Sequence, residues 1–110
     1  MSINKTLEQR GERYGKFKDV AATTYALQEI LRNAKNHEHM TDDQVIALDM
    51  ICNKMARIVN GDPNYIDNWR DVSGYSLLIV NELLVTDGAT DVDVISMTIG
   101  SKANECDQYR

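Results

Sequence analysis

Two aspartates, Asp67 and Asp71, have the residue type and spacing that most directly suggest metal binding in this sequence. On a helix, residues four apart lie one turn apart on the same face. Carboxylate oxygens are the ligands that Mg²⁺ prefers, and a bound Mg²⁺ often keeps waters for a phosphate substrate. Together with Asp49, the pair is therefore our candidate metal site.

A locally basic segment, residues 5–18, could supply a different chemistry, the binding of an anion. Its charged residues are five cations and two acids: Lys5, Arg10, Arg13, Lys16 and Lys18 against Glu8 and Glu12. We expect Arg10, Arg13 and Tyr14 to lie at a turn marked by glycines at positions 11 and 15. Guanidinium groups bind phosphate through paired hydrogen bonds, and an aromatic ring can stack on a base. The alternative is a solvated surface linked to the acids of a later helix.

Later residues complete the candidate ligand-binding set: Lys54, Arg57, Asp67, Trp69 and Asp71. Arg57 could hold an anion or pair with Asp49. Trp69 is most simply a core anchor, with base stacking as the alternative role. For the two acids, the structural alternative is an ion pair with a cation of this set or with Arg10 or Arg13, because charged side chains are seldom buried unpaired.

Helices must position these residues, because the sequence has one proline and no sustained alternating strand pattern. The pattern predicts helices over residues 4–10, 18–34, 42–60 and 66–86. Glycine at position 11 is expected to end the first of them. Thr41 and Gln44 fit a capping box at the start of the third helix. Gly61 is expected to end that helix in the left-handed conformation.

The last two predicted helices should contribute most of the core. One broad apolar arc is expected on helix 42–60, formed by Val45, Leu48, Ile51, Cys52, Met55, Ala56 and Val59. Apolar residues wrap most of helix 66–86, so we expect it to be largely buried. Gly74 costs roughly 1 kcal/mol relative to alanine within a helix, which predicts close approach of another backbone or a ligand. We therefore predict an all-α, compact bundle of about four helices over residues 1–88, followed by an extension over 89–110 that packs as a short element or is disordered.

Composition and charge exclude several classes of function. The 110 residues suffice for one domain, and a homo-oligomer could add to a modest core. No apolar run approaches roughly 18 residues and no signal-peptide pattern is present, so we expect a cytoplasmic protein without a membrane span. Cys52 and Cys106 form no CxxC pair, which argues against a disulfide framework or a zinc site. The net charge of −5 argues against direct nucleic-acid binding.

Three groups of segments resemble an uncharacterised family of small phage and prophage proteins. They are Glu8-Gln9-Arg10-Gly11 with Tyr14-Gly15-Lys16-Phe17, Ala47 to Ile51 with Lys54 to Tyr65, and Asp67 with Trp69 and Asp71 to Tyr75. The match covers about residues 7–78 and implies a viral origin, which would place the protein in the host cytoplasm. The family carries no established activity, so the resemblance implies no substrate.

More loosely, the cationic helix followed by Asp67, Asp71 and Tyr75 is similar to nucleotide-modification-associated phage domains and to MazG-like all-helical nucleotide pyrophosphohydrolases. Those hydrolases bind Mg²⁺ around a triphosphate with an ExxE motif on one helix and an ExxD motif on another. Here the two aspartates are four apart and no ExxE motif precedes them. The departure favours ligand binding over hydrolysis.

Three functions follow from these observations. The one we favour is a binding protein, without a cofactor, for a nucleotide or a nucleotide-derived signal, which a phage could sequester in counter-defence. The second is a Mg²⁺-dependent nucleotide hydrolase that uses Asp49, Asp67, Asp71 and Glu82. The third is a protein that inhibits a basic host factor by binding it through acidic residues.

Overall fold

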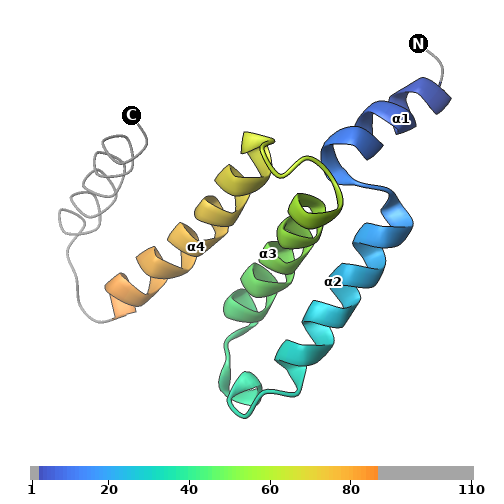
Figure 1. Ribbon diagram of the computed structural model, residues 1–110. Coiled ribbons are helices and arrows are strands. Elements are labelled where there is room, and N and C mark those ends of the chain that lie inside the picture. Colours follow the sequence, from blue (N-terminus) through green and yellow to red (C-terminus); the bar gives the residue numbers. More distant parts are fainter. Residues whose placement is uncertain (1–2, 87–110) are drawn as a thin grey trace. The chain divides into compact units, whose positions relative to one another are not determined.

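The computed structural model of the chain describes residues 3–86, which form helices joined by short connections (Figure 1). The elements are α1 (Ile3–Tyr14), α2 (Phe17–Arg32), the short 3₁₀ helix η1 (His37–His39), α3 (Asp42–Asn60) and α4 (Ile66–Thr86). No strand occurs in this described part. The all-α class predicted from the sequence is confirmed, and the predicted extension over 89–110 lies outside the described residues.

Two compact units divide the chain, with their boundary inside α4. The first unit, Met1–Tyr75, contains α1, α2, η1, α3 and the start of α4, and the packing described below is that of this unit. The second unit, Ser76–Arg110, contains the rest of α4. The domain boundary near residue 88 stays a prediction. None of the described helices combines the length and the apolar character that crossing a bilayer requires.

Hydrogen bonds that the sequence predicts fix the start of α3. Thr41 Oγ1 accepts from the backbone N–H of Gln44 at 3.1 Å, and Gln44 Oε1 accepts from the backbone N–H of Thr41 at 3.0 Å. Asp42 and Asp43 follow in the first turn, where the helix dipole favours acids. The capping box is confirmed, and the helix runs to Asn60 as predicted.

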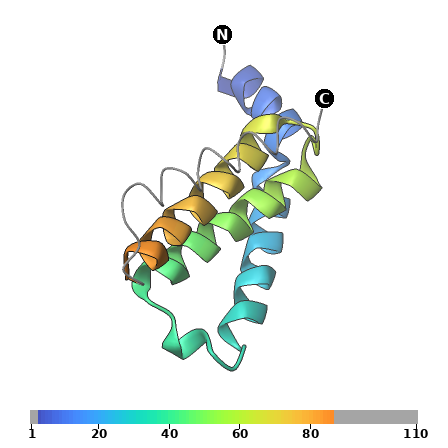
Figure 2. The ribbon, with the colours of Figure 1, turned by 90° about the vertical axis from the view of Figure 1, so that its left-hand side faces the viewer.

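The contact between α2 and α3 is the most extensive helix packing in the first unit (Figure 2). Cys52 and Ala56 are completely buried and lie one turn apart on α3. The same stripe continues to Asn60, whose Nδ2 donates to Thr23 Oγ1 on α2 at 3.0 Å. Val20 is the buried residue of α2. Small side chains on the α3 stripe allow the two helix backbones to approach closely.

A second stripe of α3 is buried on nearly the opposite side of the helix. It contains Ala47, Lys54 and Ile58. Lys54 Nζ lies 2.9 Å from Asp71 Oδ2 on the first half of α4. Because α3 is packed on two sides, the single apolar arc predicted for it is wrong, and Val59, expected in that arc, is 71% exposed.

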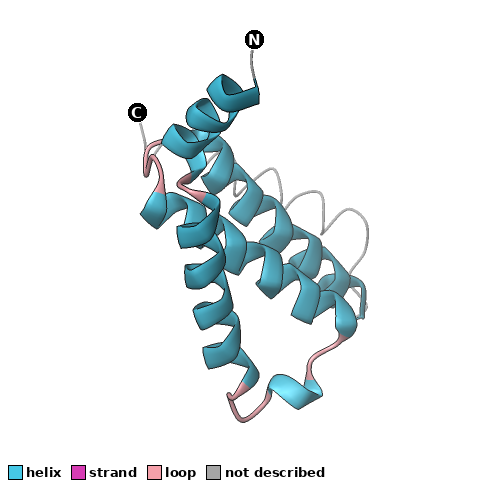
Figure 3. Cartoon of the chain, turned by 90° about the vertical axis from the view of Figure 1, so that its right-hand side faces the viewer, coloured by secondary structure: helices cyan, strands magenta, loops and turns pink. Residues whose placement is uncertain are grey.

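The first helix does not end at Gly11, contrary to the sequence prediction. α1 continues to Tyr14, and the backbone N–H of Gly15 still donates to the Gly11 carbonyl at 2.9 Å. A single glycine weakens a helix by only about 1 kcal/mol relative to alanine, so its neighbours can carry the helix through. The left-handed residue is Gly15, with a φ of +87°, in the connection between α1 and α2 (Figure 3).

The start of α4 is less buried than the sequence predicts. Asn68 is the buried residue of the described helix, whereas Trp69, expected as a core anchor, is 54% exposed. Trp69 Nε1 donates to the Pro63 carbonyl at 2.8 Å, so this side chain fastens the turn before α4. The approach of another backbone predicted at Gly74 is also wrong, because a Cβ there would meet no atom within 4 Å among the described residues. The alternative, a ligand at Gly74, stays a prediction.

Replacing Thr41 by alanine should destabilise the protein, because it removes the side-chain acceptor of the Gln44 N–H. We expect a loss of about 1 kcal/mol in the free energy of unfolding, measured by urea denaturation. Thr41→Ser keeps the hydroxyl and is the matched control, with an expected stability close to that of the wild type. Equal stability of Thr41→Ala and the wild type would contradict a stabilising role for this cap.

Candidate functional site

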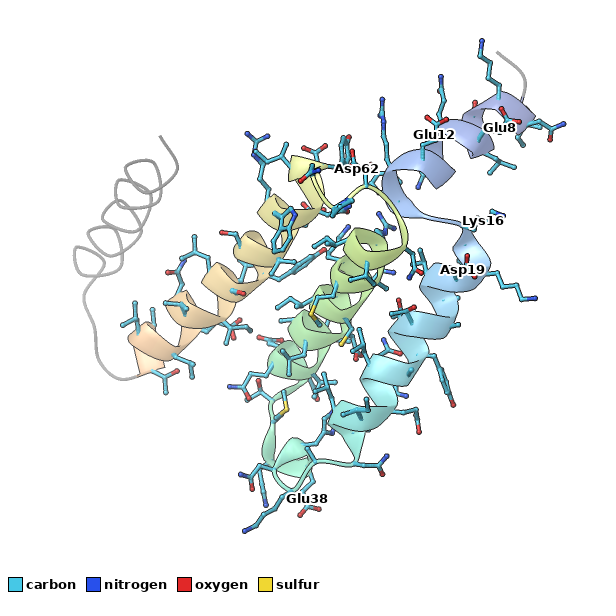
Figure 4. All side chains as sticks on the ribbon, viewed as in Figure 1. Glu8, Glu12, Lys16, Asp19, Glu38 and Asp62 are labelled. Carbon is cyan, nitrogen blue, oxygen red and sulfur yellow. The ribbon has the colours of Figure 1, made fainter. Side chains whose placement is uncertain are left out.

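Two connections of the chain meet at one end of α3. The connection between α1 and α2 contains Gly15 and Lys16, and the connection between α3 and α4 contains Gly61 and Asp62 (Figure 4). The backbone N–H of Asp62 donates to the carbonyl of Arg13 at 3.1 Å. This hydrogen bond joins the end of α1 to the residues that follow α3.

Both connections require glycine because their backbones touch. A Cβ at Gly61 would lie 2.6 Å from the Arg13 carbonyl oxygen, and a Cβ at Gly15 would lie 2.7 Å from the Cβ of Asn60. The φ of +87° at Gly15 disfavours any L side chain as well. Gly61 has a φ of −117°, so the left-handed cap predicted for it is wrong. The close contact, and not the handedness of the backbone, requires the glycine at position 61.

Three arginines and two tyrosines gather beside these connections. We call them the Arg–Tyr cluster: Arg10, Arg13, Tyr14, Arg57 and Tyr65. The guanidinium carbons of Arg10 and Arg57 lie over the Tyr14 ring, 5.3 Å and 4.8 Å from its centroid. The guanidinium carbon of Arg13 lies 5.4 Å from the centroid of the Tyr65 ring. The two rings meet edge to face, with centroids 5.5 Å apart, and all three cation–ring distances are within the range of attractive contacts.

The arginines of the cluster keep their hydrogen-bond donors available. Among the described residues, Arg10, Arg13 and Arg57 form no ion pair with a carboxylate and donate no side-chain hydrogen bond. Arg32 on α2 shows the contrast, since it pairs with Glu29 at 2.9 Å.

A pocket of about 460 Å³ opens beside the cluster, a volume typical of small-ligand sites. Its lining residues are Leu7, Arg10, Gly11, Tyr14, Gly15, Lys16, Phe17 and Arg57. Three of them are cations and none is an acid. Two guanidinium groups lie over the Tyr14 ring, whereas the Phe17 side chain is 85% exposed. The pocket therefore combines positive charge with an accessible aromatic ring.

The Tyr65 hydroxyl connects the cluster to the start of α4. Hydrogen bonding to the Asp67 carboxylate, and then to the Tyr14 hydroxyl, raises the pKa of Tyr65 above its ordinary value. Tyr65 therefore stays a neutral phenol at neutral pH. No phenolate charge then forms beside Arg13 to compete for an anion.

Four of the eight residues predicted to bind a ligand come together in the Arg–Tyr cluster: Arg10, Arg13, Tyr14 and Arg57. The other four do not line the pocket. Lys54 and Asp71 pair with each other, which is the structural alternative considered for Asp71. Asp67 bonds to Tyr65, and Trp69 bonds to the turn before α4.

Sequence reasoning missed Lys16, Phe17 and Tyr65. Lys16 and Phe17 directly follow Gly15, and Tyr65 ends the connection that begins at Gly61. Apart from the charge of Lys16, which belongs to the basic segment, their only sequence signal is this position near two glycines. That signal becomes informative once the two glycine-containing connections are known to touch.

The three candidate metal ligands do not form a metal-binding group in the described part of the chain. Asp71 is bound to Lys54. Burial, and then the charge of Asp49, raises the pKa of the Cys52 thiol, which places Asp49 beside the α2–α3 packing. No group of three or more His, Cys, Asp or Glu residues among those described could hold a metal ion.

Comparisons of the chain with protein-family models, with curated proteins and with solved structures give no match. The resemblance to small phage proteins therefore stays a prediction. The proposals below depend on the geometry of the Arg–Tyr cluster and its pocket.

Gly61→Ala should destabilise the first unit, because the new methyl group would overlap backbone atoms of the connection between α1 and α2. We expect a loss of about 1–3 kcal/mol in the free energy of unfolding, the usual cost of overpacking, measured by urea denaturation. Gly74→Ala is the matched control, since it makes the same change on a helix with open space around it. It should stabilise the protein by up to about 1 kcal/mol. Equal effects of the two substitutions would show that position 61 does not require glycine.

Asp71→Asn and Lys54→Met should destabilise the protein unequally. The Lys54 side chain is 11% exposed and that of Asp71 is 48% exposed. Asp71→Asn leaves a buried ammonium without its carboxylate, which should cost about 1–2 kcal/mol after allowance for solvent near Asp71. Lys54→Met leaves a carboxylate that water can solvate and should cost less. A larger loss for Lys54→Met in urea denaturation would contradict this assignment.

Proposed function

We propose that the protein binds a small phosphate-bearing ligand of the nucleotide type in the pocket beside Tyr14. The observation that carries this proposal is that Arg10 and Arg57 lie over one ring, have no carboxylate partner among the described residues, and line the pocket with Lys16. Guanidinium groups match phosphate with paired, charge-assisted hydrogen bonds. Contact with the ring also restricts the two side chains before binding, so less conformational entropy is lost when the ligand arrives.

A merely solvated basic surface would use its arginines differently. The sequence has 17 acidic residues, and arginines elsewhere in the described chain do find them. Arg32 lies 2.9 Å from Glu29 and Arg70 lies 3.8 Å from Asp67. In the Arg–Tyr cluster, by contrast, the guanidinium groups lie over aromatic rings and pair with no carboxylate of residues 3–86. This difference supports a site for an anion from outside the chain.

The aromatic ring of the pocket supports a nucleotide over a simple inorganic anion. The sequence predicts Tyr14 or Trp69 as the ring on which a base would stack. The Tyr14 ring already has two guanidinium groups over it. Trp69 does not line the pocket. Phe17 lines the pocket and is largely exposed. Stacking of a base on such a ring contributes about 1–3 kcal/mol. A ligand with both a phosphate and a planar ring would use the whole lining.

Binding of this kind serves a function without catalysis, because a protein can act by sequestering its ligand. If the chain is of phage origin, its ligand would be a nucleotide-derived signal of host defence. The protein would sequester this signal in the host cytoplasm. Inhibition of a host protein is the alternative. Hydrolysis has less support, since the candidate metal ligands do not form a metal-binding group among the described residues.

Arg57→Ala should weaken nucleotide binding, because it removes one of the two guanidinium groups over Tyr14. Hydrogen bonds to charged groups contribute about 1.5–3 kcal/mol, so we expect a loss of about ten- to hundredfold in affinity, measured by titration calorimetry. Arg32→Ala makes the same charge change at a distant exposed pair and should alter affinity less than about twofold. Circular dichroism of both variants would establish that each is folded.

The first step of this test is a thermal-shift screen of the wild-type protein against nucleotides, with and without Mg²⁺. We expect stabilisation that does not depend on Mg²⁺. If no nucleotide shifts the melting temperature, the proposal is overturned and a protein partner becomes the better hypothesis. If Arg57→Ala and Arg32→Ala lower nucleotide affinity equally, binding depends on the net charge of the protein and not on the pocket.

A further inference from the structure

We infer that the phosphate bound in this pocket is a terminal phosphomonoester, as in a nucleoside 5′-monophosphate, and not a phosphodiester or a polyphosphate. The inference rests on the proposed function and names the ligand class of the same site. Three properties of the pocket carry it: the charge of its lining, the number of its donors and the residues that its lining lacks.

The charge of the lining favours a dianion. Arg10, Lys16 and Arg57 contribute three positive charges, and no acid lines the pocket. A terminal phosphomonoester carries about 1.5–2 negative charges at pH 7. A phosphodiester, including a cyclic nucleotide, carries a single charge and would leave two of the three cations uncompensated. The monoester therefore gains more electrostatic energy from the same three side chains.

The donors of the lining also match three free oxygens. Arg10 comes from α1 and Arg57 from α3, and each guanidinium presents a fork that binds two acceptor sites. Lys16 adds an ammonium from the connection between the first two helices. A terminal phosphomonoester offers three strong acceptor oxygens, whereas a diester offers two. Only the monoester therefore offers a separate free oxygen to each of the three donor groups.

Residues that a polyphosphate site needs are not found in this lining. Proteins usually bind triphosphates together with Mg²⁺, which is held by carboxylates, and with a glycine-rich phosphate loop. The pocket is lined by no carboxylate, and the sequence contains no P-loop motif. The described lining therefore offers no carboxylate to hold the Mg²⁺ that usually accompanies a bound triphosphate.

Titration calorimetry of the full wild-type chain tests this inference with three probes that share one base: the 5′-monophosphate, the 3′,5′-cyclic monophosphate and the 5′-triphosphate without Mg²⁺. We expect the 5′-monophosphate to bind at least about tenfold more tightly than the cyclic form, and more tightly than the triphosphate. Lys16→Gln should reduce the preference for the monoester over the cyclic form. Lys18→Gln, at an exposed neighbour outside the lining, is the matched control and should leave that preference unchanged.

The pH dependence gives a second readout. The second proton of a phosphomonoester has a pKa near 6, so lowering the pH from 7.5 to 5 should weaken its binding by about tenfold. Cyclic monophosphate has no such proton and should bind almost equally at both pH values. The charged groups at and beside the pocket are Arg10, Lys16 and Arg57 of its lining, and Glu8 and Glu12 of α1.

The outcomes separate the two proposals. If the cyclic form or the triphosphate binds as tightly as the monophosphate, or if binding of the monophosphate does not fall at pH 5, the monoester inference is overturned and the proposed function stands. If none of the three probes binds, both proposals are overturned. If Lys16→Gln and Lys18→Gln change the preference equally, the three-cation account of the pocket is wrong.

Discussion

The stripe of Cys52, Ala56 and Asn60 along α3 is the contact on which the rest of the first unit depends. The first two side chains are fully buried, so α2 and α3 are close over the length of this stripe. Asn60 ends the stripe, and its amide donates both to Thr23 on α2 and to the Ala56 carbonyl within α3. A half-buried amide with both donors satisfied stabilises one alignment of the two helices.

Asn60 also links this packing to the site. Its Cβ lies against Gly15, so the residue that aligns α3 with α2 also limits where the connection between α1 and α2 can run. Arg57, one turn earlier on α3, then meets Tyr14 at the end of α1. The cations of the pocket thus come from different elements whose relative position is set by backbone contacts at two glycines.

The helix that brings Arg10 and Tyr14 to the site is the least firmly packed of the first unit. α1 has no buried residue. The hydrogen bond from Asp62 to Arg13 and the cation–ring contacts of the cluster are its principal described attachments. Local stability is low where buried contacts are few, and binding sites are often built from such elements.

Features with a local cause could be predicted from the sequence, and features created by distant contacts could not. The start of α3 was predictable because Thr41 and Gln44 act on each other within one turn. Arg10, Arg13, Tyr14 and Arg57 were found because their types indicate anion binding at any position. The role of Gly61 was not found, since it depends on a carbonyl that belongs to Arg13.

The same explanation holds for Trp69, Phe17 and Tyr65, whose surroundings the sequence did not predict. An aromatic residue in an apolar helix predicts burial, but the Pro63 carbonyl offers Trp69 a hydrogen bond at the surface. Phe17 and Tyr65 were overlooked because nothing near them in the sequence indicates a pocket. Where the two connections meet, Tyr65 lies against Arg13 and Tyr14, and Phe17 lines the pocket with Arg10 and Arg57.

The hydrogen bond between Asp62 and Arg13 has a consequence for the order of folding. It closes a loop that contains α2, η1 and α3, so most of the first unit lies between its two partners. Closing a long loop costs entropy before its contacts form, whereas α2 and α3 are near neighbours in the chain and can pair earlier. A partly folded chain with those two helices paired would already give a helical spectrum and would still lack the pocket. Anion binding would then detect the last stage of folding. A circular dichroism signal of helix content would not change in that stage.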